Sequence, residues 1–216
     1  MDQQNNISKI RQEYQSSRLS RNDLTENPFN FFHKWIDEAM KARIPEPTAM
    51  NLATVSYDGQ PSSRIVLLKE ITNECICFFT NYNSRKAIQI EQNNKAAVNF
   101  FWPLLERQIR IEGLIYKCDP ELSEIYFKSR PYESQLGAWA SPQSQVIENR
   151  EELLSRYEKI KHQYINPDSV PKPPHWGGYS LKPHLFEFWQ GRSGRLHDRF
   201  QYLKEDTRWI IQRLAP

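Results

Sequence analysis

The chain has 216 residues, enough for one domain with a buried core, and 38% of them are hydrophobic. Its 29 basic and 26 acidic residues are mixed along the chain and leave a net charge of +3, which argues against bulk attraction to nucleic acid. No apolar run reaches the length of a membrane span, the first residues lack the apolar stretch of a signal peptide, and the three cysteines and five histidines show no metal-ligand or disulfide spacing. We therefore expect a soluble, cytoplasmic protein that binds no nucleic acid, membrane or metal.

Residues 1–26 are rich in Gln, Asn, Ser and Arg and are predicted to form a mobile arm, followed by a single domain over residues 27–216. Within the arm, apolar residues recur at helical spacing, which would bring Arg11 and Tyr14 near one another on a short helix. The alternative is a frayed terminus, and the residue pattern by itself favours that alternative.

Asn27-Pro28 is typical of a helix start, and apolar residues follow at helical spacing to about Arg43. The pattern then changes to short extended runs, two of which bracket a turn at 58–61 as a hairpin. Strands are predicted at 49–55, 63–68, 74–80, 95–102, 107–117, 185–189, 195–202 and 208–214, and helices at 120–130, 131–140 and 148–164. Six to eight strands in mainly hairpin order indicate a mainly β fold, an antiparallel barrel with flanking helices.

The chain contains only seven glycines and neither G-x-G-x-x-G nor G-x-x-x-x-G-K-[ST], which disfavours a dinucleotide fold or a P-loop. A bound phosphate would then be held mainly by cationic side chains. Ser84 is predicted to be an N-cap, which places Arg85 and Lys86 in the first turn of a helix, where cations oppose the helix dipole. A bound phosphate would reverse that effect, because helix N-termini and cations both attract it. The alternative is that both side chains extend into water.

Two further segments carry basic residues. Tyr126 and Arg130 lie four residues apart on one predicted helix, and the proline that follows would start the next helix with Ser134 in its first turn. This arrangement could bind a phosphate, or it could be a helix–helix corner satisfied by its own side chains. Arg64 and Lys69 stand at the two ends of an apolar strand, which could face two ligands or simply meet solvent.

Arg195, His197 and Arg199 alternate at period two, which on a strand would point all three to one face. These cationic groups repel one another unless an anion or an electron-rich ring lies between them. The alternative is a solvated edge strand whose charges discourage aggregation.

No motif for a nucleophile or a catalytic metal is present, so the anion-binding clusters and the many aromatic residues suit an enzyme whose cofactor does the chemistry. A barrel without catalytic activity, binding nucleic acid through aromatic and basic residues, is the alternative from another class. The balanced charge argues against it, and strongly salt-dependent binding to single strands would support it.

Short motifs along the chain add a family resemblance. They are Arg64-Ile65-Val66-Leu67-Leu68-Lys69, Thr80-Asn81, Ser84-Arg85-Lys86-Ala87, Glu106-Arg107-Gln108, Ser129-Arg130-Pro131, Ser134-Gln135-Leu136-Gly137-Ala138-Trp139, Trp176-Gly177-Gly178, Trp189-Gln190-Gly191, Arg195-Leu196-His197-Asp198-Arg199 and Arg213-Leu214-Ala215-Pro216. Each motif alone is weak, but in this order and spacing the chain, from about Arg11 to Pro216, resembles the bacterial pyridoxamine 5′-phosphate oxidase family.

This resemblance implies an FMN-binding split β-barrel that works as a homodimer with its sites at the subunit interface. It also implies the reaction, which is the oxidation of pyridoxamine or pyridoxine 5′-phosphate to pyridoxal 5′-phosphate. Hydride passes from the substrate C4′ to flavin N5, and O₂ reoxidises the flavin to give H₂O₂. A split-barrel FMN reductase, or an FMN oxidase of another substrate, is the alternative among flavoproteins.

The resemblance also implies the site residues. FMN contacts are expected from Arg64, Ile65, Val66, Leu67, Phe79, Thr80, Arg85, Lys86, Gln108, Gln143, Ser144, Trp189 and Arg199. Substrate contacts are expected from Arg11, Tyr14, Lys69, Tyr126, Arg130, Ser134, Arg195, Leu196 and His197, with Arg195 and His197 as the catalytic residues. The N-terminal arm would then act as a lid that excludes water, in place of the frayed terminus that the pattern favours.

Overall fold

The computed structural model describes residue 9 and residues 13–15, 17–72 and 74–216. Its contacts divide the chain into two compact units. Unit 1 comprises the described residues up to Pro47 together with Asn99–Ile111 and Leu185–Pro216, and unit 2 comprises Thr48–Val98 and Glu112–His184. Three strands, β5 (Lys95–Trp102), β6 (Arg107–Lys117) and β7 (Trp176–Gln190), each contribute one end to each unit.

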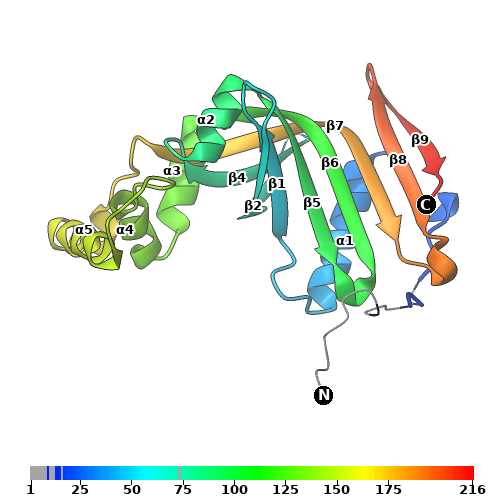
Figure 1. The fold of residues 1–216 in the computed structure, drawn as a ribbon, viewed down its shortest axis with the longest axis horizontal. Helices are drawn as coiled ribbons and strands as arrows, with labels where there is room; N and C mark the ends of the chain where they lie inside the picture. Colours follow the sequence, from blue (N-terminus) through cyan, green and yellow to red (C-terminus); the bar gives the residue numbers. More distant parts are fainter. Residues whose placement is uncertain (1–8, 10–12, 16, 73) are drawn as a thin grey trace. The chain divides into compact units, whose positions relative to one another are not determined.

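Unit 2 is built mainly of strands, shown in Figure 1. Besides its share of β5–β7 it holds β1 (Ala49–Val55), β2 (Pro61–Leu67), β3 (Glu70–Thr72) and β4 (Cys75–Asn81). The strand order is β2-β1-β5-β6-β7-β4-β3, and the pairs β1–β2, β3–β4 and β4–β7 are antiparallel. Buried residues alternate with more exposed ones along β1, as the period of a half-buried strand requires. The predicted hairpin of β1 and β2 is confirmed, and it turns at Gly59 with a φ of +87°.

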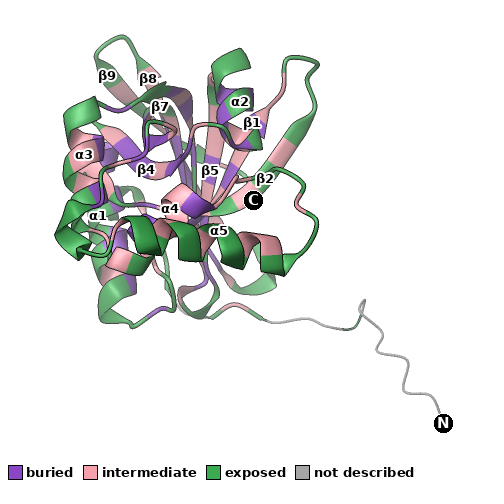
Figure 2. Ribbon diagram, turned by 90° about the vertical axis from the view of Figure 1, so that its left-hand side faces the viewer, coloured by how far each residue is buried: buried purple, intermediate pink, exposed green. Residues whose placement is uncertain are grey.

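The helices of unit 2 are α2 (Arg85–Gln92), α3 (Pro120–Ser129), α4 (Tyr132–Ala140) and α5 (Arg150–Gln163). Asp119 caps α3 and Asn149 caps α5, each accepting a hydrogen bond from a backbone N–H of the first turn at 2.8 and 2.9 Å. Figure 1 shows α3, α4 and α5 lying together, and the core beside them contains Phe127, Leu136, Val170 and Trp176. Helix α5 has no buried residue, which its largely exposed colouring in Figure 2 reflects.

Unit 1 contains α1 (Pro28–Lys41), β8 (Asp198–Glu205) and β9 (Arg208–Leu214). Asn27 caps α1 by accepting from the N–H of Phe29 at 2.9 Å, so the predicted helix start is confirmed. The C-terminal part of β7 pairs antiparallel with β8, and β8 with β9. The apolar face of α1 packs aromatic rings edge to face on β7, with Phe29 5.0 Å from Phe186 and Phe31 4.8 Å from Phe188. The short 3₁₀ helices of unit 1 are η2 (Arg21–Asp23), η3 (Pro103–Leu105) and η5 (Ser193–Arg195), whereas η4 (Pro167–Ser169) belongs to unit 2.

Strands β7 and β3 differ from the prediction. Strand β7 begins at Trp176 instead of residue 185, because residues 176–181 pair with β4, a long-range partner that the local pattern does not reveal. The short strand β3 was not predicted, and it too is defined by its pairing with β4.

Arg195 and His197 lie outside any strand, contrary to the prediction that they alternate with Arg199 on one strand face. Gly194 and Arg195 have φ values of +60° and +61°, a left-handed conformation that interrupts an extended run. The backbone N–H of Arg192 donates to Nδ1 of His197 at 3.1 Å and closes the turn. Of the three cationic side chains, only Arg199 belongs to β8.

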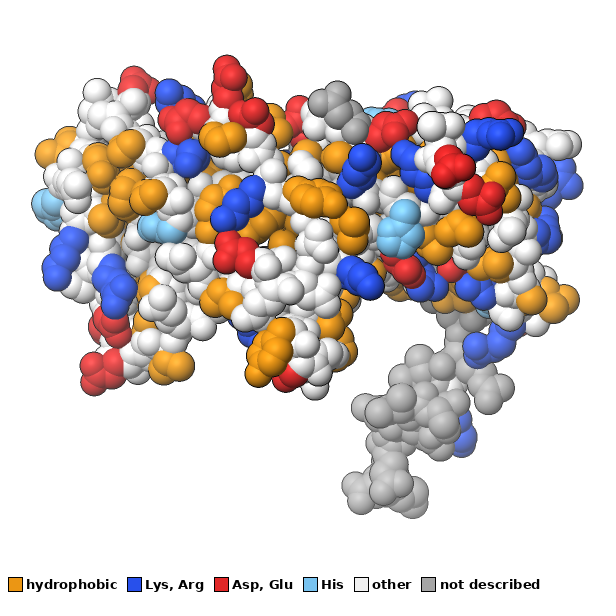
Figure 3. Space-filling model, turned by 90° about the horizontal axis from the view of Figure 1, so that it is seen from above, with side chains coloured by type: hydrophobic (Ala, Val, Ile, Leu, Met, Phe, Trp, Pro, Cys, Tyr) orange, Lys and Arg blue, Asp and Glu red, His pale blue; other side chains and the backbone are white. Residues whose placement is uncertain are grey.

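The surface agrees with the balanced composition. On the face shown in Figure 3, acidic and basic side chains are interspersed. Across the described residues, no helix has both the length and the apolar character needed to cross a membrane. Cys77 and Cys118 are buried, free thiols.

Candidate active site

Unit 2 contains a cavity of about 480 Å³ where most of the predicted residues from this unit meet. Its lining consists of Arg64, Ile65, Val66, Leu67, Lys69, Phe79, Thr80, Lys86, Tyr126, Arg130, Pro131, Ser134, Gln143 and Trp176. Pro131 and Trp176 are the members that were not predicted as site residues. Arg85 and Ser144 were predicted as contacts, but they are not part of this lining.

Cationic side chains gather at the start of α2. Ser84 occupies the N-cap position as predicted, but its hydroxyl donates to the carbonyl of Asn81 (2.7 Å) and does not cap the helix. Lys86 Nζ donates to Gln143 Oε1 at 2.7 Å and to Thr80 Oγ1 at 3.0 Å. Burial, and to a smaller extent the charge of Arg64, lowers the pKa of Lys86 to about 8.

The charges of this cluster are not compensated by acidic side chains. Within the described residues, Arg64, Arg85 and Lys86 form no ion pair with a carboxylate. Burial, followed by the charge of Arg85, lowers the pKa of Arg64. A helix N-terminus with three neighbouring cations and no carboxylate is suited to an anion.

A second cation faces the cavity at the junction of α3 and α4. Arg130 ends α3, and its guanidinium carbon lies 4.8 Å from the ring centre of Trp176. Its NH1 nitrogen is buried and has no hydrogen-bond partner among the described residues, and burial lowers the pKa of the guanidinium. Ser134 lies in the first turn of α4, as predicted, and also lines the cavity. A buried donor without an acceptor is costly, so this corner is suited to a second anion.

Three parallel aromatic rings, those of Phe79, Tyr126 and Trp176, stack on one another in the lining of the cavity. The ring centre of Phe79 lies 4.0 Å from Tyr126 at an interplanar angle of 19°, and 5.5 Å from Trp176 at 11°. Gly178 faces Phe79 across the β4–β7 pair, and a Cβ there would come within 2.8 Å of the Phe79 ring. The absence of a side chain at Gly178 therefore leaves room for the Phe79 ring against β7. In the sequence, the Trp-Gly-Gly motif was the sign that Trp176 and Gly178 have a role, but it does not reveal which residues they contact.

The other predicted residues belong to unit 1. Trp189 on β7 is the direct cross-strand partner of Arg199 on β8, so the register brings these two predicted FMN contacts together. His197 lies 4.6 Å from Trp189 between ring centres, and Tyr14 lies 5.6 Å from Trp189 and 5.7 Å from His197. Gln108 is a partly buried residue of β6, and Leu196 is 74% exposed. Arg11 lies outside the described residues.

The environment of His197 determines which nitrogen carries the proton. Nδ1 accepts the N–H of Arg192, so the neutral ring has its proton on Nε2. Burial, and then the charge of Arg195, lowers the pKa of His197 and favours this neutral form. His197 therefore presents Nε2–H as a hydrogen-bond donor.

A buried carboxylate holds Arg199 in place. Glu187 is 4% exposed, and it pairs with Arg199 and with Arg110, each at 2.9 Å. Arg199 NH1 also donates to the carbonyl of Ala215 at 2.7 Å. The guanidinium of Arg199 is thus fixed by the protein itself, which suits a residue that orients a ligand.

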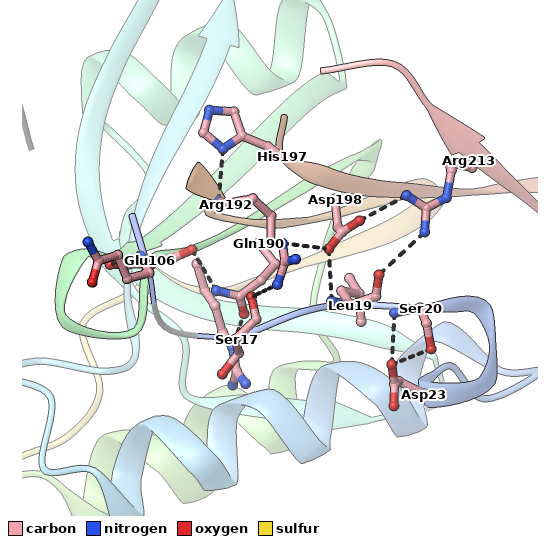
Figure 4. A network of polar contacts seen from close by, with 12 residues as sticks. Ser17, Leu19, Ser20, Asp23, Glu106, Gln190, Arg192, His197, Asp198 and Arg213 are labelled. Atoms are coloured by element: carbon pink, nitrogen blue, oxygen red, sulfur yellow. Dashed lines mark hydrogen bonds and ion pairs between the residues drawn. The ribbon is translucent and has the colours of Figure 1, made fainter. Parts of the chain in front are cut away.

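Within unit 1, a polar network centred on Asp198 binds the N-terminal segment, as drawn in Figure 4. Asp198 accepts from the N–H of Leu19 at 3.1 Å and from Arg213 at 2.8 Å, and Arg192 lies 3.6 Å away. Further along the segment, the N–H of Gln15 donates to Glu106 at 3.0 Å. These bonds hold Tyr14 against Trp189 and His197. A frayed terminus would instead leave Tyr14 in solvent.

Comparison with known proteins agrees with these features. Residues 36–164 match the family described as pyridoxamine 5′-phosphate oxidase, and residues 176–216 match the pyridoxine 5′-phosphate oxidase C-terminal dimerisation region. A pyridoxine/pyridoxamine 5′-phosphate oxidase of Neisseria gonorrhoeae is 52% identical over 209 residues, covering 96% of this chain and 98% of that protein. One from Cytophaga hutchinsonii is 51% identical over 212 residues, covering 98% of this chain and 99% of that protein.

Solved structures show the same architecture. PhzG from Burkholderia lata, determined with tetrahydrophenazine-1-carboxylic acid, superposes with a TM-score of 0.87 at 28% identity, covering 93% of this chain and 99% of that one. A pyridoxamine 5′-phosphate oxidase-related, FMN-binding protein of Nostoc punctiforme has the same fold, with a TM-score of 0.71 at 18% identity over 88% of this chain and 98% of that one. The predicted fold class, a mainly antiparallel split β-barrel with flanking helices, is confirmed. The chain belongs to the pyridoxamine 5′-phosphate oxidase family.

Proposed function

We propose that this protein is a cytoplasmic, homodimeric FMN-dependent oxidase that converts pyridoxamine and pyridoxine 5′-phosphate to pyridoxal 5′-phosphate, with O₂ as acceptor and H₂O₂ as product, and with ammonia released from the amine. The observation that carries the proposal is one cavity lined by cations from two elements, Lys86 on α2 and Arg130 after α3, and by stacked aromatic rings. Relatives at 51–52% identity that are named for this activity support it, as does the match to the dimerisation region of the family.

The residues present fit FMN. The uncompensated cations Arg64, Arg85 and Lys86 at the start of α2 suit the flavin phosphate, and Thr80 and Gln143 share hydrogen bonds with Lys86. When bound, FMN supplies the hydride acceptor and a route for the electrons to O₂. Gln108, Trp189 and Arg199 are the contacts we expect from unit 1.

At the junction of α3 and α4, Arg130 and Ser134 would hold the substrate phosphate, since NH1 of Arg130 is a buried donor in need of an acceptor. The stacked rings of Phe79, Tyr126 and Trp176 give the cavity an aromatic lining, which suits an aromatic ligand. Lys69 lines the same cavity.

We expect Arg195 and His197 to orient the reacting carbon of the substrate. His197 can donate a hydrogen bond from Nε2–H to the amine or hydroxyl on that carbon, because its Nδ1 is already occupied by the N–H of Arg192. Arg11 and Tyr14 would close over the substrate.

The test is an absorption spectrum of the purified protein, recorded before and after anaerobic addition of pyridoxine 5′-phosphate. We expect an oxidised-flavin spectrum that is bleached by the substrate, and H₂O₂ after O₂ is admitted. Protein that is colourless and gains no flavin when FMN is added would refute the proposal.

Arg130→Ala tests the substrate assignment in the same assay. We expect KM for pyridoxine 5′-phosphate to rise roughly 10- to 100-fold with the flavin spectrum intact, as for the loss of a hydrogen bond to a charged group. PhzG, whose structure holds a carboxylic acid ligand, represents the competing substrate class. Efficient turnover of an unphosphorylated substrate that survives Arg130→Ala would favour an oxidase of that kind.

A further inference from the structure

Gln89 is a buried polar residue of α2 to which no role has so far been assigned. It is 4% exposed, and its Oε1 lies 2.6 Å from Thr54 Oγ1, 2.7 Å from Ser62 Oγ and 3.4 Å from Arg64 NH2. Three donors converge on this atom, so the side chain must present its oxygen to them and not its NH₂ group. The residue thus links α2 to β1 and β2, which carry Thr54, Ser62 and Arg64.

The hydrogen bonds of this group run in one direction. Arg64 donates to Thr54 Oγ1 and to Ser62 Oγ, both at 2.6 Å, and to the carbonyl of Leu52 at 3.2 Å. Each hydroxyl accepts from Arg64 and has one proton left, which it donates to Gln89. Gln89 Oε1 is therefore the terminal acceptor of the network that fixes the guanidinium of Arg64.

The hydrogen-bond acceptors around the Arg64 guanidinium are all neutral groups. A carbonyl, two hydroxyls and an amide orient the guanidinium without cancelling its charge, and no carboxylate pairs with it within the described residues. Arg64 lines the cavity together with Lys86, whose helix also carries Gln89. One side chain of α2 thus sets the orientation of a cation on β2.

We propose that Gln89 is a positioning residue for the phosphate of FMN, acting through Arg64 as the acceptor that ends its hydrogen-bond network. This inference rests on the proposed function, because the anion is taken to be the flavin phosphate. Without the acceptor, the two hydroxyls lose their common partner and Arg64 can leave the orientation in which it faces the anion. The loss should affect a flavin that has a phosphate and spare one that lacks it.

The test compares FMN with riboflavin, which lacks only the phosphate, by titrating the apoprotein and following the quenching of flavin fluorescence. The variants are Gln89→Met, which keeps the volume and removes the acceptor, and Gln89→Glu, which keeps acceptor oxygens but adds a carboxylate beside Arg64. Gln92→Met is the matched control, because Gln92 is an exposed residue at the end of the same helix. Circular dichroism and thermal unfolding verify that each variant is folded.

We expect Gln89→Met to weaken FMN binding roughly 10- to 100-fold, the range for a lost hydrogen bond to a charged group, and to leave riboflavin binding within about twofold. Gln89→Glu should also weaken FMN binding and spare riboflavin, because its carboxylate cancels the charge of Arg64, and Gln92→Met should match the wild type. The decrease of FMN affinity with ionic strength, which reports the phosphate interaction, should be shallower in Gln89→Met.

Three results would overturn the inference. They are equal losses of FMN and riboflavin affinity in Gln89→Met, which would make the residue a purely structural support; unchanged FMN affinity in Gln89→Met; and unchanged FMN affinity in Gln89→Glu. If Gln89→Met does not fold, the FMN and riboflavin affinities of Gln89→Glu decide, and a loss of both in that folded variant refutes the inference. A wild type that binds neither flavin would instead refute the proposed function.

Discussion

Lys86 and Arg130 are each roughly half buried, and each lacks a carboxylate partner within the described residues. Burying a cation without a counter-charge is unfavourable, which is why burial lowers the pKa of both groups. An anionic ligand would relieve this cost at both positions. Perturbed groups that line one cavity are therefore evidence for a binding site, since a purely structural ion pair would have supplied its own carboxylate.

The pKa of Lys86 leads to a testable pH dependence. With a pKa of about 8 in the free protein, Lys86 is charged at neutral pH and loses its proton above about pH 8. The flavin phosphate stays fully ionised over this range, because its second pKa is about 6. We expect FMN affinity to fall above pH 8 with a limiting slope of roughly tenfold per pH unit, and titrations from about pH 7 to about pH 9 would measure it.

Lys86→Arg is the control for this titration, because a guanidinium keeps its charge throughout the range. Its FMN affinity should be nearly independent of pH, whatever its absolute value. Equal slopes in the wild type and in Lys86→Arg would show that another group causes the pH dependence. The same pKa shift also sets how Lys86 affects folding stability. In the unfolded chain Lys86 has its ordinary pKa of 10.5, so between about pH 8 and 10.5 the unfolded chain binds more protons than the native state. The contribution of Lys86 to the free energy of unfolding therefore increases with pH over this range.

At the level of elements, the end of β7 and the N-terminal segment meet at Gly191. A Cβ at this position would lie 2.9 Å from Tyr14 Cγ and 2.9 Å from Glu106 Cβ, closer than real Cβ contacts. The absence of a side chain at Gly191 is therefore what lets Tyr14 pack near Trp189 and His197. Gly137, inside α4, has nothing within 4 Å of the corresponding position.

These two glycines should respond to alanine in opposite directions. We expect Gly191→Ala to lower the free energy of unfolding by about 1–3 kcal/mol, as overpacking does, or to expel Tyr14. Gly137→Ala should raise it by about 0.5–1 kcal/mol, because alanine is the better helix former and the space is open. Thermal or urea unfolding of both variants measures the difference, and the fluorescence of Trp189 near Tyr14 reports displacement. A Gly191→Ala variant with unchanged stability and unchanged fluorescence would show that the segment adapts without cost.

At the scale of the whole molecule, bound FMN should stabilise the folded protein against unfolding. A ligand that binds only the native state stabilises it by about 2.7 kcal/mol at a free concentration one hundred times Kd. For a protein of this size, that corresponds to a rise in Tm of roughly 5–11 °C. Differential scanning calorimetry of apo- and reconstituted protein tests this expectation. A Tm that does not change with added FMN would contradict binding to the native state.

Several features were readable from the sequence because their causes are local. The start of α1 at Asn27-Pro28 and the bounds of β5 and β6 follow from capping residues and from apolar periodicity. The cationic start of α2 was predicted in the same way, since Arg85 and Lys86 are adjacent to their cap. The family motifs then named most of the residues that line the unit 2 cavity.

Other features depend on contacts between residues far apart in the chain, and these only the tertiary structure decided. The period-two pattern at Arg195 and His197 suggested a strand, but two consecutive left-handed residues and a turn closed by His197 overrule it. Trp176 entered the site because β7 pairs with β4 and places it beside Phe79. Gln89 is one polar residue of a short helix in the sequence, and only the fold places it against Arg64. Local patterns determine the elements, whereas the partners of buried polar groups depend on how distant strands and helices pack.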